Sequence, residues 1–258
     1  MEIKFWGVRG SIAVSGARYA RAGGNTSCVE LVHAGERLVL DGGTGLRALG
    51  ETHVGPMRAV VLFSHVHWDH IQGVPFFGPA YHPDSELVLV GAGLREALAA
   101  QMRAPTFPVG LDALRARIEW RDAAPLQIGP FRATPVALRH PNGVVAWRVE
   151  AGGASVVYAT DTEHAGVVDP RLVELARGAD LLVHDAQYTP EEYPTRRGWG
   201  HSTWLEAAEA AVAAKVGRLA LFHHDPARDD DTLAVIEDRA RARFGGAFAA
   251  REGACTGL

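Results

Sequence analysis

The sequence predicts an α/β (α+β) fold in which two sheets pack face to face and helices cover their outer sides. Short apolar runs alternate with turns in both halves of the 258-residue chain, and helical patterns are added mainly in the second half. No repeat of about 20–50 residues and no low-complexity linker divides the chain, so we expect a single domain over residues 1–258. Polar side chains that can bind a metal follow several of the apolar runs, where α/β folds usually place their chemistry.

Apolar runs, either alternating with polar residues or continuous, indicate the strands. We expect strands at residues 3–7, 28–32, 37–40, 59–63, 87–90, 131–138, 144–150, 155–159, 180–183 and 219–222. The turns at 34–36 and 152–153 join the strands on either side of each into a hairpin. Glycines between residues 10 and 25 indicate a long loop.

Proline and capping signals indicate the helices. Pro170 is typical of a first helical turn, and Ser202-Thr203 followed by Glu206 is typical of a capped helix start. We expect helices at residues 94–102, 112–117, 170–177, 203–216 and 230–244, with a short helix or loop at 74–81. Prolines interrupt residues 103–130, which we expect to form an excursion overhanging the functional site.

Composition excludes several classes of protein. The apolar fraction of 47%, the charged fraction of 22% and the net charge of −4 are ordinary for a globular protein, and argue against one that chiefly coats nucleic acid. The two cysteines, Cys28 and Cys255, form no C-x-x-C pair, so a disulfide framework is not expected. No apolar stretch approaches the ~20 residues of a membrane span, and the amino terminus has no signal-peptide pattern. We therefore expect a cytoplasmic protein without membrane contact.

The richest stretch for chemistry follows the apolar run at 59–63. Its ligand candidates are His65, His67, Asp69 and His70. In an extended segment His65 and His67 point to the same side. Neutral imidazoles with a carboxylate suit zinc, with manganese or iron as alternatives. Asp41 follows an earlier strand and is either a simple turn residue or a group that holds this loop by hydrogen bonds.

Similar side chains follow later apolar runs. They are His140, Asp161, Asp185 and His223. Strands of one layer bring their ends to one edge, so we expect these distant residues to meet His65 and His67. A single histidine or aspartate of this kind is usually a packed or surface residue. The ordered recurrence indicates a metal site.

This ordered set resembles the metallo-β-lactamase superfamily, through the H-x-H-x-D-H motif at 65–70 followed by His140, Asp161 and His223. The resemblance implies a four-layer αββα sandwich with two divalent metal ions between the sheets. One ion would be held by His65, His67 and His140, and the other by Asp69, His70 and His223, with Asp161 bridging them. His224 competes with His223 for its role. No cysteine lies near Asp161, which disfavours lactam hydrolysis.

Three further segments resemble ribonuclease Z and related phosphodiesterases. They are Tyr158–Thr162, Leu182–Ala186 and Gly200–Thr203. Ribonuclease Z enzymes usually insert a long arm that grips tRNA between the residues matching His140 and Asp161, and this chain has only a hairpin there. The low net charge agrees with a missing arm, since tRNA binding requires Lys and Arg that neutralise phosphates.

The resemblance implies a hydrolase, and we expect a phosphodiesterase acting on a small diester such as a cyclic nucleotide. A ribonuclease Z-like RNA-processing enzyme and a lactone, ester or lactam hydrolase are the alternatives, and a homodimer stays open. The reaction is expected to involve His201, Asp185 and Asp69. His201 would supply a proton to the leaving oxygen, with Asp185 accepting its other ring N–H. Five aromatic residues could stack on a base, or pack in the core: Trp68, Phe76, Phe77, Tyr188 and Trp199.

Overall fold

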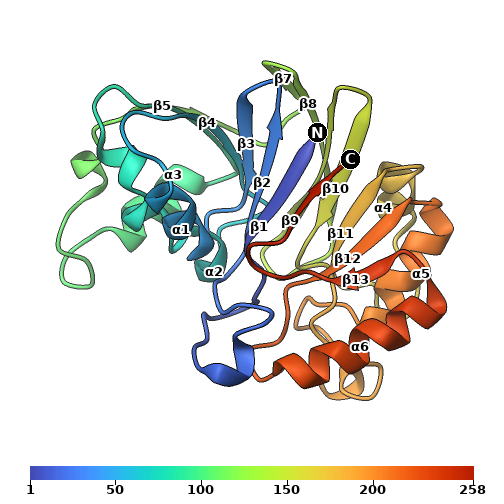
Figure 1. The fold of residues 1–258 in the computed structure, drawn as a ribbon. Helices are drawn as coiled ribbons and strands as arrows, with labels where there is room; N and C mark the ends of the chain where they lie inside the picture. The colour runs from blue at the N-terminus through green and yellow to red at the C-terminus, as the bar shows by residue number, and fades with distance from the viewer.

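The computed structural model describes residues 1–258 and contains two seven-stranded mixed sheets that face each other (Figure 1). The first sheet has the order β14 (Cys255–Gly257), β1 (Glu2–Gly7), β2 (Cys28–His33), β3 (Glu36–Leu40), β4 (Arg58–Leu62), β5 (Glu86–Val90) and β6 (Arg117–Arg121). The second has the order β13 (Ala247–Ala249), β12 (Arg218–Phe222), β11 (Leu181–Asp185), β10 (Ala154–Ala159), β9 (Val144–Ala151), β8 (Phe131–Leu138) and β7 (Leu126–Ile128).

Helices lie on the outer side of each sheet. The first sheet carries α1 (Gly45–Glu51), α2 (Trp68–Ile71) and α3 (Leu94–Gln101), and the second carries α4 (Pro170–Ala176), α5 (Trp204–Ala214) and α6 (Asp230–Arg243). In Figure 1 the two helical sets lie on opposite sides of the paired sheets. The predicted four-layer αββα sandwich is therefore confirmed. No helix is long and apolar enough to cross a membrane.

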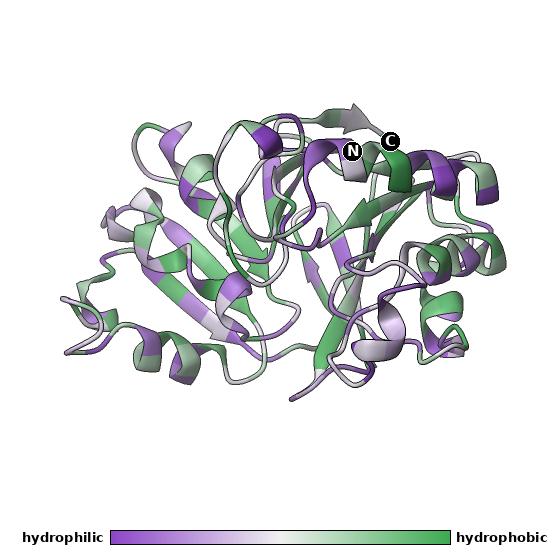
Figure 2. Ribbon diagram, turned by 90° about the horizontal axis from the view of Figure 1, so that it is seen from below, coloured by the Kyte–Doolittle hydropathy of each residue, from purple (hydrophilic) through white to green (hydrophobic).

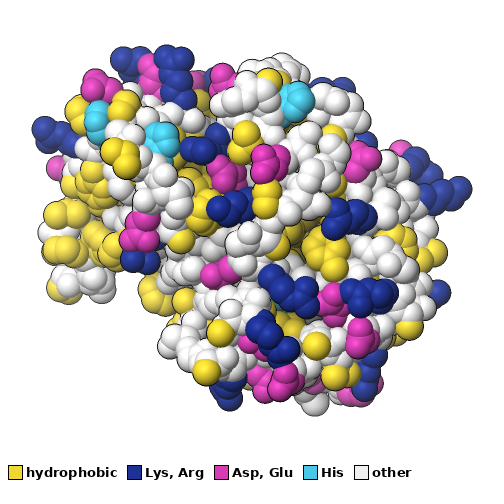
Figure 3. Space-filling view, in the orientation of Figure 1, with side chains coloured by type: hydrophobic (Ala, Val, Ile, Leu, Met, Phe, Trp, Pro, Cys, Tyr) yellow, Lys and Arg dark blue, Asp and Glu magenta, His cyan; other side chains and the backbone are white.

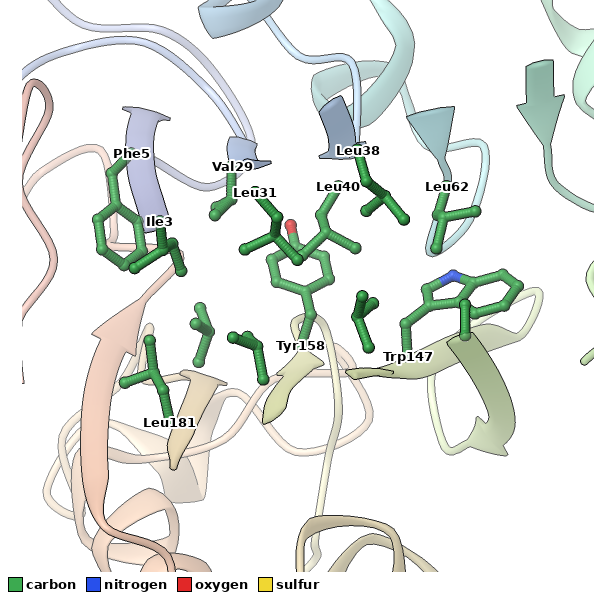
Figure 4. Close-up of a cluster of buried hydrophobic side chains, with 14 of the residues drawn as sticks. Ile3, Phe5, Val29, Leu31, Leu38, Leu40, Leu62, Trp147, Tyr158 and Leu181 are labelled. Atoms are coloured by element: carbon green, nitrogen blue, oxygen red, sulfur yellow. The ribbon is translucent and has the colours of Figure 1, made fainter. Parts of the chain in front are cut away.

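Three apolar cores hold the four layers together. The central core packs side chains of both sheets against one another, including Leu31 and Leu40 from the first sheet and Trp147 and Tyr158 from the second (Figure 4). Two outer cores join each sheet to its helices. In Figure 2 many strand segments are hydrophobic, whereas the helices alternate between hydrophilic and hydrophobic residues, as burial of one helical face requires. Trp147 also donates its ring N–H to Phe63 O at 3.1 Å, which ties the sheets together beside the H-x-H-x-D-H motif.

Strand direction brings the candidate residues together. Strands β3 to β6 are parallel, as are β10 to β13, and the remaining neighbours are antiparallel. The carboxyl ends of parallel strands meet at one edge of a sheet. Residues that follow β3, β4, β10, β11 and β12 therefore come together at the same edge of the sandwich.

Most predicted elements are confirmed within one or two residues at their ends. The capped helix start is present, since Thr203 and Glu206 exchange side-chain and backbone bonds in a capping box. The helix expected at 112–117 is wrong. Only a 3₁₀ turn forms at Leu111–Ala113, and Arg117 begins β6 instead. The alternation of outward and inward side chains in Arg117–Arg121 suits an edge strand paired with β5.

The segment at 103–130 is also not a single overhanging excursion. Its second half supplies β6 and β7 to the two sheets, and only the part before β6 leaves them. Helix α1 and strands β13 and β14 were also not expected from the sequence. Helix α1 forms despite its glycines because Leu46 and Leu49 pack into the core beneath the first sheet. The carboxyl-terminal tail adds β13 and β14 to the edges of the two sheets.

Candidate metal centre

The ligand candidates form two groups at the shared sheet edge. His65, His67 and His140 form one, which we call the outer group because His67 and His140 are partly exposed. Asp69, His70, Asp161 and His223 form the other, which we call the inner group because all four are buried. The ligand atoms within each group lie within 4.8 Å of one another. The structure thus brings together all seven residues that the resemblance proposed as ligands.

Ring nitrogens of the outer group face a common point. His140 Nε2 lies 3.0 Å from His67 Nδ1, and the His65 and His67 rings have centroids 4.4 Å apart. The other ring nitrogen of His140 donates to Gly200 O at 2.8 Å, which orients Nε2 toward the site. This is a set of three imidazoles around one small volume.

Side chains of the inner group pair carboxylates with imidazoles. His223 Nε2 lies 3.1 Å from Asp69 Oδ2 and 3.2 Å from Asp161 Oδ1. His70 Nε2 lies 3.3 Å and 3.2 Å from the same two carboxylates. Gln187 Oε1 accepts the Nδ1–H of His223 at 2.8 Å, and the Ser11 N–H donates to Asp69 at 2.6 Å. These bonds leave the Nε2 of each histidine directed at the carboxylates.

Asp161 stands between the groups. Its Oδ1 faces the inner group, 3.2 Å from both His70 and His223. Its Oδ2 faces the outer group, 3.7 Å from His65 Nε2 and 3.8 Å from His140 Nε2. A carboxylate with one oxygen toward each group has the position of a bridging ligand.

The donors fit a pair of divalent cations. The buried Nε2 of His65 has no hydrogen-bond partner, and the buried Nε2 of His70 has only the two carboxylate contacts described above, although a buried polar atom without a partner is costly. A metal ion accepts such a lone pair, and the nitrogen and carboxylate donors here are those that zinc prefers. The outer group offers neutral donors, whereas the inner group adds the negative charge that offsets a second cation.

Asp41 orients His70 and accepts three further hydrogen bonds. Its carboxylate accepts the Nδ1–H of His70 at 2.7 Å, the hydroxyl of Tyr158 at 2.8 Å, and both the N–H and the hydroxyl of Ser64 at 2.7 and 2.8 Å. The side chain is fully buried. The sequence left two interpretations of Asp41 open, and the structure supports the one in which Asp41 holds the metal-binding loop by hydrogen bonds.

Electrostatics keep the outer histidines neutral. Burial lowers the pKa of His65 well below its ordinary value, and burial also lowers the pKa of His67 and of His140 despite the nearby Asp161. In the inner group burial opposes protonation of His70, but Asp161, Asp69 and Asp41 outweigh it and raise the pKa of that imidazole. The same negative charge favours a divalent cation at this point.

Backbone conformation at three strand ends is unusual. Asp41, Asp161 and His223 have φ angles of 62°, 50° and 59°, in the left-handed region that residues other than glycine seldom adopt. Asp41 and His223 follow a strand directly, and Asp161 follows β10 after one residue, so the chain turns sharply there and directs the side chain into the site. Backbone strain of this kind concentrates at functional sites.

His201 and Asp185 lie beside the inner group. His201 Nδ1 lies 2.7 Å from Asp185 Oδ2 and 3.9 Å from Asp161 Oδ2. Burial by itself lowers the pKa of His201, but the carboxylates of Asp185, Asp161 and Asp69 outweigh it and raise the pKa to about 9. The imidazole therefore carries a proton near neutral pH. Its ring stacks on that of His223, with centroids 5.0 Å apart.

The two adjacent histidines diverge. His223 faces the inner group, whereas His224 donates its Nε2–H to Ala250 O at 2.9 Å on the far side of the strand.

Sequence reasoning missed Gln187 and the turn at Gly10-Ser11. A signal existed for the turn, because Gly10 follows the first strand. A Cβ there would lie 2.4 Å from the His223 ring, so only glycine leaves that ring its place.

Comparisons with known proteins agree with this geometry. Residues 36–224 match the family model described as the beta-lactamase superfamily domain. An uncharacterized protein of Mycobacterium leprae is 34% identical over 220 residues, covering 81% of this chain and 73% of the relative. Ribonuclease Z of Natronomonas pharaonis is 28% identical over 284 residues, covering 89% of this chain and 91% of that enzyme.

Among solved structures, the metallo-beta-lactamase fold protein YhfI from Bacillus subtilis superposes with a TM-score of 0.77. It is 21% identical, and the match covers 99% of this chain and 98% of that protein. The likeness shows the fold. The family model extends over most of the chain and includes every candidate ligand. The predicted superfamily and its ribonuclease Z-like branch are confirmed: this chain belongs to the beta-lactamase superfamily domain family, among the hydrolases of the metallo-β-lactamase fold.

Proposed function

We propose that the protein is a metal-dependent phosphodiesterase that cleaves a small phosphodiester, such as a cyclic nucleotide. The observation that carries this proposal is the combination of the two ligand groups with the hydrogen-bonded pair of His201 and Asp185 beside them. His65, His67 and His140 would hold one divalent ion, and Asp69, His70 and His223 the other, with Asp161 between them. Zinc suits these donors best, and manganese or iron are the alternatives.

Two such ions, when bound, acidify a water and neutralise charge on the reacting phosphate. The chain itself supplies the proton for the leaving oxygen. Asp185 accepts the Nδ1–H of His201, which fixes the tautomer and leaves the Nε2–H free to donate. Burial lowers the pKa of His201, but the carboxylate of Asp185 outweighs burial and raises that pKa, which favours the protonated imidazole. An alkoxide leaving group needs such a general acid because it is a strong base.

The alternatives are less well supported. A ribonuclease Z-like enzyme is favoured by the relative of that name, but residues 144–159 form only the hairpin of β9 and β10, with no room for an RNA-gripping arm. On the face in Figure 3, Lys and Arg lie among Asp and Glu, with no continuous basic surface for an RNA backbone. A lactam hydrolase is disfavoured because neither Cys28 nor Cys255 belongs to the ligand groups.

An activity screen on the metal-loaded protein tests the proposal. The substrates are bis-nitrophenyl phosphate, 3′,5′-cyclic nucleotides, a precursor tRNA and a lactam. We expect turnover of the two small diesters, and slower cleavage of the tRNA. Lactam hydrolysis with no diester cleavage would contradict the proposal, and tRNA cleavage at rates matching the small diesters would favour the ribonuclease.

Two further proposals concern the chain as a whole. The central core joins both sheets, which supports one domain over residues 1–258. Cys28 is buried, Cys255 is exposed, and the two are not paired, which supports a reducing compartment such as the cytoplasm.

A further inference from the structure

One buried carboxylate has no part in the chemistry described so far. Glu163 lies two residues after Asp161 and is 4% exposed. It accepts the hydroxyl of Tyr193 at 2.7 Å, the Gly198 N–H at 2.8 Å and the Gly200 N–H at 3.1 Å. Charge-assisted bonds of this kind are stronger than neutral ones. Glu163 therefore fixes the loop at 196–200 in one position.

That loop lies against the candidate metal centre. Gly200 O accepts the Nδ1–H of His140 at 2.8 Å, and His201 follows directly. Gly200 has a φ of 90°, and a Cβ there would lie 2.1 Å from His140 Nδ1, so the approach is as close as a glycine permits. The position of the loop is thus coupled to both an outer ligand and the proton donor.

The loop displays an aromatic ring and positive charge. The Trp199 side chain is 56% exposed, and the Arg196 guanidinium lies 4.7 Å from the centre of its ring. Arg197 is exposed beside them. A tryptophan on a loop whose backbone is held at Gly198 and Gly200 offers a flat surface on which a nucleobase can stack, and neighbouring arginines attract an anionic substrate.

The other exposed tryptophan near the site differs in chemistry. Trp68 is 59% exposed and lines a groove of about 630 Å³ with Phe76 and Phe107. No charged side chain lines that groove. A phosphate-bearing nucleotide is anionic, so the Trp199 loop matches its charge and the groove does not.

We infer that Trp199 determines specificity by stacking on the base of a nucleotide substrate, and that Glu163 is the positioning residue that holds Trp199 and His201 in place. This inference rests on the proposed function and narrows its substrate to diesters that carry a nucleobase. Pre-organisation of the loop would reduce the entropy lost on binding.

The test compares two phosphate monoesters, one that carries a nucleoside and one that carries only a methyl group. Binding of adenosine 5′-monophosphate and of methyl phosphate to the zinc-loaded protein is measured by calorimetry, which requires no turnover. The wild type should bind the nucleotide more tightly. The Trp199→Ala variant should lose about five- to hundredfold in nucleotide affinity, at least five times its loss for methyl phosphate.

Trp68→Ala is the matched control, because Trp68 has similar exposure but lies in the uncharged groove. It should change both affinities by less than about twofold. If Trp68→Ala shows the nucleotide-selective loss instead, or if Trp199→Ala loses both ligands equally, the inference is wrong. Equal affinity of the wild type for the two monoesters also contradicts it.

Glu163→Gln tests the positioning role. In the wild type two backbone N–H groups donate to the Glu163 carboxylate, and in the variant the NH₂ of the glutamine amide, itself a donor, would face one of them. It should reduce nucleotide affinity as Trp199→Ala does, and also lower kcat on small diesters through His201, while zinc content and the folded near-ultraviolet spectrum persist. Tyr193→Phe removes one bond from the same carboxylate and should have a clearly smaller effect. Equal effects of the two variants would contradict the positioning role.

Absence of diester cleavage by the wild type would defeat the proposed function alone, because the binding comparison would still decide the role of Trp199.

Discussion

The two ligand groups differ in burial, in charge and in how firmly they are held. In the inner group each histidine has a fixed partner for its Nδ1–H, Asp41 for His70 and Gln187 for His223. In the outer group His140 and His65 also have Nδ1 partners, Gly200 O and Ser64 Oγ, but the Nε2 of His67 has only a contact of 3.3 Å with Asn142, an exposed residue. The inner group also contains both ligand carboxylates, Asp69 and the bridging Asp161, whereas the outer group has histidines alone.

This difference indicates a division of labour. A pre-organised, negatively charged inner group should bind its ion first and most tightly, because no side chain must be ordered and the cation offsets buried charge. The outer group is neutral and more accessible, which suits an ion that meets the substrate. Substitutions in and around the two groups should therefore have different effects.

Asp161→Ala should abolish the difference between the groups, because Asp161 alone faces both. We expect the paired binding of two metal ions to be lost. We also expect kcat/KM to fall by more than about 10³-fold, in line with removing a group that acts in every step. Zinc content and activity on bis-nitrophenyl phosphate are the measurements. A variant that retains two ions and full activity would show that Asp161 is not the bridge.

His201→Ala should leave both groups intact and affect only proton delivery. We expect both ions to remain and kcat to fall roughly 10²–10⁴-fold on a diester with an alkoxide leaving group. Asp185→Ala should give a smaller loss in the same direction. The loss should shrink with nitrophenolate, a leaving group that needs no proton, and an equal loss for both leaving groups would exclude a general acid.

Asp41→Asn should weaken the inner group selectively. The amide cannot accept every bond that the carboxylate accepts from His70, Tyr158 and Ser64, so His70 loses its fixed orientation. We expect the affinity for the inner ion to fall about 10–100-fold, measured by competition with a zinc chelator. Tyr158→Phe removes one bond and should cost less. Selective loss of the outer ion instead would reverse the assignment.

A pair of histidines outside both groups should make folding sensitive to acid. Asp169 N–H donates to His164 Nδ1, His164 Nε2 lies 3.0 Å from His184 Nε2, and His184 Nδ1 donates to Asp185 O, so the chain of bonds needs both rings neutral. Burial lowers the pKa of His164 and of His184 to about 4.

The unfolded chain, with histidine pKa values near ~6.5, binds more protons between about pH 6.5 and pH 4, so the free energy of unfolding falls as pH drops through that window. Replacing His184 with Gln should make this slope shallower by up to about 1 kcal/mol per pH unit. Urea unfolding at several pH values, with chelator present, measures the slope. An unchanged slope would mean that His184 does not titrate as its burial indicates.

Sequence reasoning found the layers and the ligand candidates because both depend on local patterns. Apolar runs followed at once by His or Asp mark strand ends, and parallel strands then bring those ends together. The partners of the ligands were harder to find, because Asp41 and Gln187 act across 29 and 36 residues of sequence through contacts that only the fold creates.

Errors fell where packing overrides local preference. Helix α1 was not predicted, since Gly45 and Gly50 weaken its helical pattern, yet it forms because Leu46 and Leu49 are buried beneath the first sheet. Residues 117–121 alternate as a strand does, but nearby prolines and a weak helical pattern concealed it. The cap at Thr203 was predictable because a capping box is a purely local device.

Metal stoichiometry is the sharpest test of the two-group arrangement. Zinc bound per chain is measured after refolding without chelator, in the wild type and in His67→Ala, which removes the least restrained ligand of the outer group alone. The two-group arrangement predicts close to two equivalents in the wild type and close to one in the variant, with the remaining ion held by the inner group. One equivalent in the wild type, or two or none in His67→Ala, would contradict it.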